Sequence, residues 1–388
     1  MHSTEQTEEI FAQLSWFQRD RVDKARVMVV GAGALGNEVL KNLALFGVGH
    51  ITVVDFDHIE EHNLTRSVLF THADAEGRRQ KAIVVAERLI EMNPAMEVDA
   101  ICGDIAYDVG LGLLSTMDVV IGCVDNRLAR YHINRLCMRA GIPWVDGGID
   151  GLEGTARVFM PGENCYACSL GPEGLKDLAY RMPCAGIVRR NESAGRAATT
   201  PIIASIIGAV EVQEALKLIH REQLEAGALT SLCGRMFCYE GQHLTTKFVE
   251  FKAYDDDCAV HEQWTSVVTS DITTTTTVAA SLQQLRVLLG DDNPQVTLND
   301  CFVDFVEAKD DGKQVEVMKP GRAVAEYLET ETPLRGRRSD EVYQHEYSVL
   351  DASFPFQELT LAQVGIPQQD ILHVVTRQGD NYIAMRGA

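Results

Sequence analysis

Three glycines near the start of the chain are the first residues whose spacing points to chemistry. Residues 27–40 read VMVVGAGALGNEVL, so Gly31, Gly33 and Gly36 follow an apolar run and open a helical pattern. Glycines at this spacing let the backbone approach phosphate oxygens, and the following helix N-terminus offers N–H donors. The stretch predicts a nucleotide site. Alone it fits NAD, a nucleoside triphosphate or a plain strand-to-helix turn.

Charged and polar side chains beyond the glycines favour a nucleoside triphosphate. They are Asp55 and Asp57 in VVDFDHIEEH, Asn63 and Arg66 in NLTR, Lys81 at the start of a helical stretch and Asp125 in IGCVDN. A hydride-transfer site needs no such set, whereas Arg and Lys neutralise phosphates and Asp holds Mg²⁺ through oxygen. A solvated charge cluster is the alternative explanation.

The motifs GAGALG, DFDHIEEHNLTR, the Lys81 segment and CVDN follow one another in an order that resembles the ThiF/MoeB superfamily, which includes the ubiquitin-activating enzymes. The resemblance covers roughly residues 25–265. It implies ATP-dependent adenylation of the C-terminal glycine of a ubiquitin-like protein. It further implies that Asp55 holds the ribose and that Asn63, Arg66 and Lys81 contact the phosphates. Asp125, assisted by Asp57, is then expected to coordinate Mg²⁺.

Two positions depart from the family pattern. Ser67 stands where the family has Gln, and residues 1–18 lack the arginine that relatives commonly donate to the γ-phosphate across a dimer. Arg19 and Arg21 are the nearest substitutes. We therefore expect a homodimer in which one of them reaches the neighbouring subunit, with a partner protein as the alternative source of the charge.

Two short pairs predict a structural zinc site. Cys165 and Cys168 form C-x2-C, and Cys258 and His261 form C-x2-H, which together make a Cys3His set suited to tetrahedral Zn²⁺. The resemblance supports this prediction, because the family commonly closes a zinc site with two such pairs. Unrelated buried cysteines and a surface histidine are the alternative.

A catalytic thiol is expected at Cys184. It lies in a polar stretch with Arg181, Arg189 and Arg190, whose charges favour a thiolate. In ubiquitin-activating relatives a loop in this region carries the cysteine that captures the acyl group. An inert cysteine in an adenylation-only enzyme is the alternative. Apolar surroundings place five other cysteines in the core: Cys102, Cys123, Cys137, Cys233 and Cys238.

The elements that must position these residues alternate between strand and helix in the first half. Strands are expected at 26–30, 51–54, 96–102, 118–122 and 143–146, and helices at 34–46, 79–92 and 127–140. This alternation predicts a Rossmann-like, doubly wound, mostly parallel sheet. RVFMPGENCYAC should leave that sheet, residues 169–200 should form a long loop, and a helix should start at Pro201, followed by a strand in LTTKFVEF.

A second, smaller α+β domain is expected at residues 266–388, after an adenylation domain at 1–265. Thr273–Thr277 are read as linker or entry strand, 359–364 as a short helix, and ILHVV and YIAM as strands. This part weakly resembles the ubiquitin-fold domain that recruits a conjugating enzyme. A generic small α+β domain is equally compatible.

Composition narrows the class of protein. The 388 residues carry 56 acidic and 35 basic side chains, a net charge of −21, which argues against nucleic acid or membrane as partner. No long apolar run or signal peptide is evident, so we expect a cytoplasmic protein. The alternative hypotheses for the function are a sulfur-carrier adenylyltransferase and a non-catalytic partner subunit. An NAD oxidoreductase is the alternative that the sequence favours least.

Overall fold

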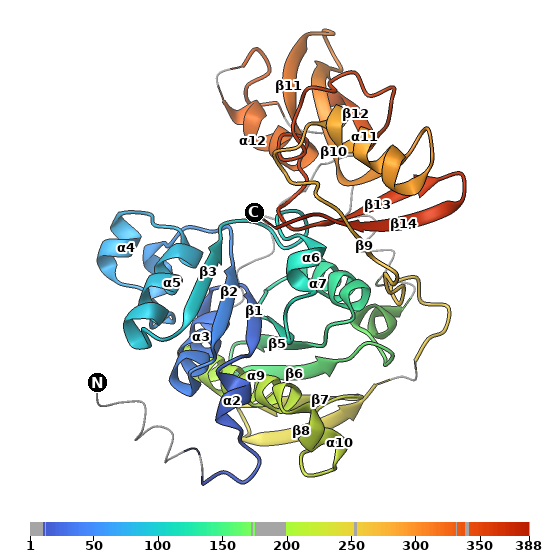
Figure 1. Cartoon of the computed structure of the whole chain (residues 1–388). Helices are drawn as coiled ribbons and strands as arrows, with labels where there is room; N and C mark the ends of the chain where they lie inside the picture. Colours follow the sequence, from blue (N-terminus) through green and yellow to red (C-terminus); the bar gives the residue numbers. More distant parts are fainter. Residues whose placement is uncertain are drawn as a thin grey trace. The chain divides into compact units, whose positions relative to one another are not determined.

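The structure is a computed structural model that describes residues 11, 13–171, 174, 199–251, 254–330, 332–337 and 341–387. Two compact units make up the chain (Figure 1). The first contains residues up to Ala106, Leu114–Gly171 and the described part of Gly195–Gln263. The second contains Tyr107–Leu113 and the residues from Trp264 onward. The domain division expected from sequence at 265/266 remains a proposal.

An eight-stranded sheet organises the first unit, in the order β3-β2-β1-β4-β5-β6-β7-β8. Its parallel strands are β1 (Arg26–Val30), β2 (His50–Val54), β3 (Glu97–Ile101), β4 (Val119–Gly122) and β5 (Trp144–Asp150). The antiparallel strands are β6 (Glu153–Phe159), β7 (Arg235–Glu240) and β8 (Thr245–Glu250). This arrangement confirms the doubly wound, mostly parallel sheet.

The helices of this unit connect and cover the strands. They are α2 (Arg19–Val22), α3 (Ala34–Phe46), the 3-10 helix η1 (Glu61–Thr65), α4 (His72–Glu76), α5 (Lys81–Met92), α6 (Leu111–Leu114), α7 (Arg127–Ala140), α9 (Pro201–Ile219) and α10 (Arg221–Glu225). The expected helices at 34–46 and 127–140 are confirmed at both ends, and α9 starts at Pro201 as expected, with Thr200 as its N-cap.

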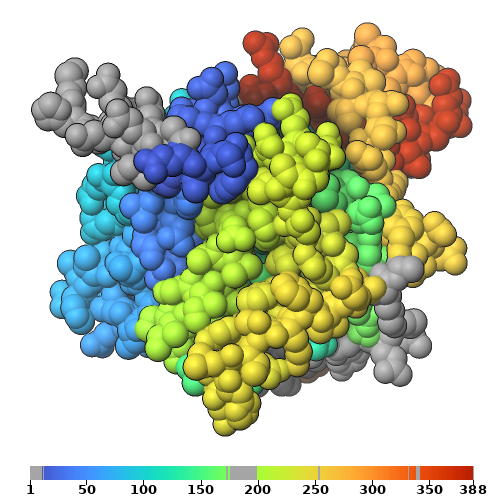
Figure 2. All heavy atoms as spheres, turned by 90° about the horizontal axis from the view of Figure 1, so that it is seen from below, coloured from blue at the N-terminus to red at the C-terminus, as the bar shows by residue number. Residues whose placement is uncertain are grey.

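One sequence expectation about the sheet was wrong. The RVF of RVFMPGENCYAC does not leave the sheet, because Arg157–Phe159 form the end of β6 and pair with β5 and β7. A chain reversal at Gly151–Leu152, where Gly151 has φ 58°, keeps the segment in register. β8 closes the sheet at its edge with all six residues exposed, and the β7–β8 hairpin lies on the face seen in Figure 2.

The second unit is built on another sheet, in the order β11-β10-β13-β14-β9, with β12 also paired to β10. Its strands are β9 (Val268–Thr269), β10 (Gln295–Ala308), β11 (Gln314–Pro320), β12 (Val342–Leu350), β13 (Ile371–Thr376) and β14 (Gly379–Ala384). Its helices are α11 (Val278–Leu289), α12 (Val324–Glu329) and the 3-10 helix η2 (Gly321–Ala323). The smaller α+β unit and its strands at ILHVV and YIAM are therefore confirmed.

One local expectation in this unit was wrong, and one of two alternatives for another segment is excluded. Residues 361–365 form turns rather than a helix. The threonine run is not a strand, because Thr273 and Thr276 hydrogen-bond each other in a turn and Thr277 caps α11 by accepting from the amide of Ala280. Threonine side chains compete for nearby backbone groups, which favours turns and caps here over extended structure. Among the described helices, none has the length and apolar character needed to cross a membrane.

Candidate nucleotide and metal sites

The carboxyl ends of the parallel strands bring the first set of predicted residues to one edge of the sheet. Gly31 donates its amide to the carbonyl of Val54 at 2.8 Å, and Cys123 donates to Val30 at 2.8 Å. The loops after β1, β2 and β4 are thereby held side by side. The direction of winding reverses between β1 and β4, which is where open α/β sheets bind ligands.

Each glycine of the loop has a separate geometric reason. Gly31 has φ +96°, and a Cβ there would lie 2.5 Å from the Cys123 carbonyl oxygen. A Cβ on Gly36 would lie 1.9 Å from the carbonyl oxygen of Gly31. Gly33, by contrast, faces open space and caps α3 without any side-chain hydrogen bond. Space and free N–H donors at Gly33 suit an incoming phosphate.

The Asp55 carboxylate holds the glycine loop and the loop after β2 through backbone hydrogen bonds. Its carboxylate accepts from the Ala32 amide at 2.7 Å and from the Asp57 amide at 2.8 Å. Burial raises the pKa of Asp55 above its ordinary value, against the opposing charge of Lys81 and these two hydrogen bonds. A half-buried carboxylate fixed at the end of β2 can accept hydrogen bonds from a ribose, which is the role predicted for it.

Lys81 and Asp57 form the cation–carboxylate pair of this edge. Lys81 Nζ lies 2.9 Å from Asp57 Oδ2, with the lysine side chain 9% exposed and the aspartate 55% exposed. The Lys81 amide also donates to the Asp57 carbonyl at 3.0 Å, which ties the start of α5 to the loop after β2. The pair leaves a nearly buried ammonium beside an accessible carboxylate, suited to phosphate and Mg²⁺.

The side chains of Asn63 and Arg66 make hydrogen bonds within their own segment. The Asn63 side chain is buried and accepts from the Glu60 amide at 2.9 Å, closing a capping box on η1. Arg66 donates to the His62 carbonyl at 3.0 Å and pairs with no carboxylate among the residues described. The buried Ser67 hydroxyl likewise has no partner in the described part of the chain.

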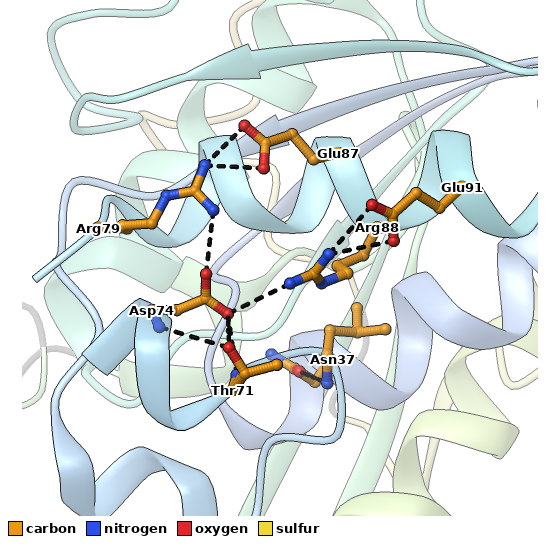
Figure 3. A network of polar contacts seen from close by, with 8 residues as sticks. Asn37, Thr71, Asp74, Arg79, Glu87, Arg88 and Glu91 are labelled. Carbon is orange, nitrogen blue, oxygen red and sulfur yellow. Dashed lines mark hydrogen bonds and ion pairs between the residues drawn. The ribbon is translucent and has the colours of Figure 1, made fainter. Parts of the chain in front are cut away.

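A network of ion pairs holds α4 against α5 (Figure 3). Asp74 accepts from the Thr71 hydroxyl at 2.6 Å and from Arg79 at 3.0 Å, and Arg88 lies 3.5 Å away. Burial opposes ionisation of Asp74, but the hydrogen bonds from Thr71 and Arg79 and the charge of Arg88 outweigh it, so its pKa is lowered. Arg79 then reaches Glu87 on α5 at 2.6 Å.

Asp125 lies exposed three residues after β4, where the sequence placed it. The neighbouring Asn126 caps α7 by accepting from the Ala129 amide at 2.8 Å and donates to Asp125 at 3.2 Å. The cap fixes the backbone next to Asp125 and leaves its carboxylate open to solvent. The carboxylate is thus available for a hydrated cation.

Sequence reasoning missed a supporting residue, Asn37. It is fully buried on α3, donates to the carbonyls of Ala32 and Gly33 at 2.8 and 3.0 Å, and accepts from the Leu69 amide at 2.9 Å. It joins the glycine loop to the segment that follows Arg66. The only sequence signal is a polar residue within an otherwise apolar helix face.

A buried charge cluster around β5 was missed as well. Asp146 on β5 is fully buried and pairs with Arg130 at 2.8 Å and with Arg157. Glu211 on α9 lies against Gly147, and a Cβ on that glycine would be 2.4 Å from the Glu211 carboxyl carbon. Neither Glu211 oxygen has a hydrogen-bond partner among the described residues. Burial, with a smaller contribution from Asp146, raises its pKa well above the ordinary value.

The four predicted metal ligands come together. Ligand atoms of Cys165, Cys168, Cys258 and His261 all lie within 4.8 Å of one another. Cys168 Sγ is 3.2 Å from His261 Nε2, and Cys165 Sγ is 3.6 Å from Cys168 Sγ. Three soft thiols and one imidazole at this spacing fit a closed tetrahedral Zn²⁺ site. The cluster joins the segment after β6 to the segment that ends the first unit.

The two candidate arginines have other partners within the same chain. Arg19 donates to the carbonyls of Phe46 and Gly47 at 2.8 and 2.6 Å, so it caps the C-terminus of α3. Arg21 pairs with Glu222 at 2.6 Å. The expectation that one of them serves a neighbouring subunit's phosphates is not supported, because each is held within its own chain.

Cys184 and the arginines around it lie outside the described residues. Of the five cysteines expected in the core, Cys137 and Cys238 are buried and Cys123 and Cys233 are half-buried. Cys102 is exposed, which corrects that expectation. It directly follows the last residue of β3.

Fold and site together define a doubly wound α/β unit with a glycine loop at the carboxyl edge of its sheet and a Cys3His cluster. Residues 7–260 match the ThiF family model, and the chain belongs to this family. The family resemblance drawn from the four motifs is therefore confirmed.

Curated relatives agree in class. The chain is 32% identical over 240 residues to the SAMP-activating enzyme E1 of Haloferax volcanii, which covers 62% of this chain and 81% of that protein. It is also 32% identical over 228 residues to the sulfur carrier protein adenylyltransferase of Thermus thermophilus, covering 57% and 77%. The match to mouse adenylyltransferase and sulfurtransferase MOCS3 is 32% over 248 residues and spans half of that relative, against 64% of this chain.

Solved structures agree in fold. Escherichia coli MccB with ATP superposes with a TM-score of 0.51 at 21% identity, over 66% of this chain and 74% of MccB. Identity at this level supports the fold of the first unit and nothing about substrate.

Proposed function

We propose that this chain is an ATP-dependent adenylyltransferase that activates the C-terminal carboxylate of a ubiquitin-like or sulfur-carrier protein. The observation that carries the proposal is the common edge of β1, β2 and β4. There an open glycine loop, the Asp55 carboxylate and the Lys81–Asp57 pair lie together in a chain of the ThiF family. The three relatives named above are each 32% identical and are each named as an activating enzyme or an adenylyltransferase, which supports the same class.

In the proposed reaction a carboxylate oxygen of the carrier attacks the α-phosphorus of ATP, and the bond to the bridging oxygen breaks to release pyrophosphate. The α3 N-terminus at Gly33 and the cations Lys81 and Arg66 stabilise the negative charge on the phosphates. Asp55 orients the nucleotide through its ribose. Mg²⁺, when held by Asp125 and Asp57, supplies further charge neutralisation at the phosphates.

The Cys3His cluster is proposed to bind Zn²⁺ in a structural role. Four protein ligands close a tetrahedral site and leave no position for substrate. The metal would tie the segment after β6, which carries Cys165 and Cys168, to the segment after β8, which carries Cys258 and His261.

Later steps belong to the finer proposal. The Cys184 thiol would attack the acyl adenylate, form a thioester and release AMP, and a conjugating enzyme recruited by the C-terminal unit would accept the acyl group. Sulfur-carrier activation, in which no such thioester is passed on, is the alternative favoured by the relatives from Thermus and mouse. A homodimer and a cytoplasmic location remain predictions.

Pyrophosphate exchange into ATP tests the proposal. Full-length protein is mixed with purified ubiquitin-like and sulfur-carrier proteins, and we expect exchange only when one of them has a free C-terminal carboxylate. Lys81→Ala should lower exchange about 100-fold, as expected for removal of one preorganised charge at the reacting phosphates. Lys41→Ala, which breaks an ion pair on α3, is the matched control and should keep the activity.

A thioester assay separates the two alternatives. A carrier adduct that is sensitive to thiols and absent in Cys184→Ala supports the ubiquitin-like route. Carrier-dependent exchange without any adduct supports sulfur-carrier activation. Absence of exchange with every carrier tested, despite ATP binding, would contradict the proposed function and favour a non-catalytic partner subunit.

A further inference from the structure

The connection between β3 and β4 is unusual because part of it belongs to the second unit. Both strands lie in the sheet of the first unit, yet Tyr107–Leu113 group with the residues from Trp264 onward. We call Tyr107–Leu113 the clasp. Sequence reasoning assigned it no role.

Polar contacts attach the clasp to the rest of the second unit. The Leu111 amide donates to Asp370 Oδ1 at 2.8 Å, and the Leu113 amide donates to the Gln369 carbonyl at 3.0 Å. Arg322 lies 2.8 Å from Asp108 and 3.0 Å from the buried Asp300, so it bridges the clasp to β10. These groups would lose buried partners if the clasp withdrew, which makes the contact specific.

Two glycines make the contact too close for any other residue. A Cβ on Gly110 would lie 2.1 Å from the Gln368 carbonyl oxygen, and a Cβ on Gly112 would lie 2.5 Å from the Gln369 carbonyl oxygen. Real side chains do not approach backbone oxygens at these distances. The clasp is therefore shaped to this one partner surface.

The connection from the nucleotide edge to the clasp is short and packed. Asp55 donates its amide to the Ile101 carbonyl, at the end of β3, at 3.1 Å. The clasp begins six residues after that strand end, so the connection spans at most about 22 Å when fully extended. Ile105 and Ala106 within it are 3% and 8% exposed, and the Ala106 amide donates to Asp104 at 2.9 Å. A buried, internally bonded connection of this length has little slack.

We propose that the clasp couples nucleotide binding at the Asp55 edge to the order of the C-terminal unit. This inference rests on the proposed ATP function. A ligand that binds the ordered form of the loop after β2 lowers the population of open forms at the end of β3. Because the connection to the clasp is short and buried, the same openings release Leu111 and Leu113 from Asp370 and Gln369, and ATP suppresses both.

Hydrogen exchange of the full-length protein with and without ATP·Mg²⁺ tests the coupling. We expect ATP to slow exchange of the Leu111 and Leu113 amides and of the amides in residues 366–372 by about fivefold or more. A factor of about five is the lower end of the range in which one site changes the affinity of another. Slowing confined to the glycine loop and α3 would overturn the coupling while leaving the ATP function intact. Slowing in neither place would overturn the ATP function and the coupling with it.

Variants of the clasp give an independent check. Gly110→Ala should keep ATP-dependent slowing at the glycine loop and lose it at residues 366–372. Asp108→Asn, a milder change that removes one carboxylate from Arg322, should reduce the ATP-dependent slowing at residues 366–372. Asp271→Asn breaks an exposed pair with Arg386 in the same unit and should leave it unchanged. Undiminished slowing at residues 366–372 in both clasp variants would overturn the coupling.

Discussion

Glu211→Gln should change how the stability of the protein depends on pH. The Glu211 carboxyl is fully buried against Gly147, and neither oxygen has a hydrogen-bond partner within the described residues. Burial raises its pKa well above the ordinary 4.5, so the native state keeps the proton over a range in which the unfolded chain has lost it. Glutamine has nearly the same shape and carries no titratable proton.

The sign and size follow from proton linkage. Above pH 4.5 the native state binds one proton more than the unfolded state at this site, so stability falls as pH rises. The slope is about 1.4 kcal/mol per pH unit until the native pKa is reached. The wild-type protein should therefore lose stability relative to Glu211→Gln between pH 5.5 and pH 6.5, by at most about 1.4 kcal/mol.

Urea unfolding at both pH values measures this difference directly. Groups that do not interact with Glu211 titrate equally in the two proteins and cancel when the free energies of unfolding are subtracted. Glu214→Gln on the same helix is the control. Glu214 pairs with Lys217 and accepts from the Leu232 amide at 2.7 Å, so its replacement should destabilise the protein. A wild-type-to-Glu211→Gln difference that does not vary with pH would show that Glu211 is ionised in the native state and would refute the reasoning.

Three further predictions concern the loop, the network and the metal. The added methyl group of Gly33→Ala meets open space, so this variant should keep the free energy of unfolding and bind ATP about tenfold more weakly or worse. The methyl group of Gly36→Ala clashes with the Gly31 carbonyl and should destabilise the fold. Equal effects of the two substitutions in calorimetry would contradict this distinction. Asp74→Ala should cost about 2–3 kcal/mol in urea unfolding at pH 7, because it removes charge-assisted hydrogen bonds. As the folded pKa of Asp74 is lowered, that cost should be present above the ordinary 3.8 and shrink as pH falls below it, and a cost that persists in acid would argue against an ionised Asp74. Metal analysis should find about one zinc per chain, lost in Cys258→Ala and retained in Cys238→Ala; a metal-free wild-type protein would contradict the site.

Local patterns predicted most of the first unit because strand, loop and helix signals there agree with one another. The run Val27–Val30 is apolar, Gly31 and Gly36 have no room for a side chain, and the helix Ala34–Phe46 ends at Gly47 with φ 69°. The Cys3His set was also within reach, since both pairs show ligand spacing in the sequence. Each of these signals is local, although 93 positions separate the two ligand pairs themselves.

Features that depend on distant partners were not predictable in the same way. Arg19 is equally suited to a phosphate or to the C-terminus of a helix, and only its contacts with Phe46 and Gly47 decide between them. In the sequence Glu211 has the pattern of an ordinary helix residue, and only the folded chain shows that its carboxyl group lies against Gly147. The clasp joins residues more than 250 positions apart, as Leu111 and Asp370 do, and no local pattern encodes such a contact.

Mass spectrometry of the carrier protein tests the central claim most directly. The full-length protein is incubated with ATP·Mg²⁺ and a ubiquitin-like or sulfur-carrier protein, with pyrophosphatase present to remove the released pyrophosphate. The proposal predicts that AMP becomes attached to the carrier's C-terminal glycine, and that neither Lys81→Ala nor a carrier with a blocked C-terminal carboxylate yields the adduct. ATP hydrolysis or AMP transfer at any other position, with the C-terminal glycine unmodified, would contradict it.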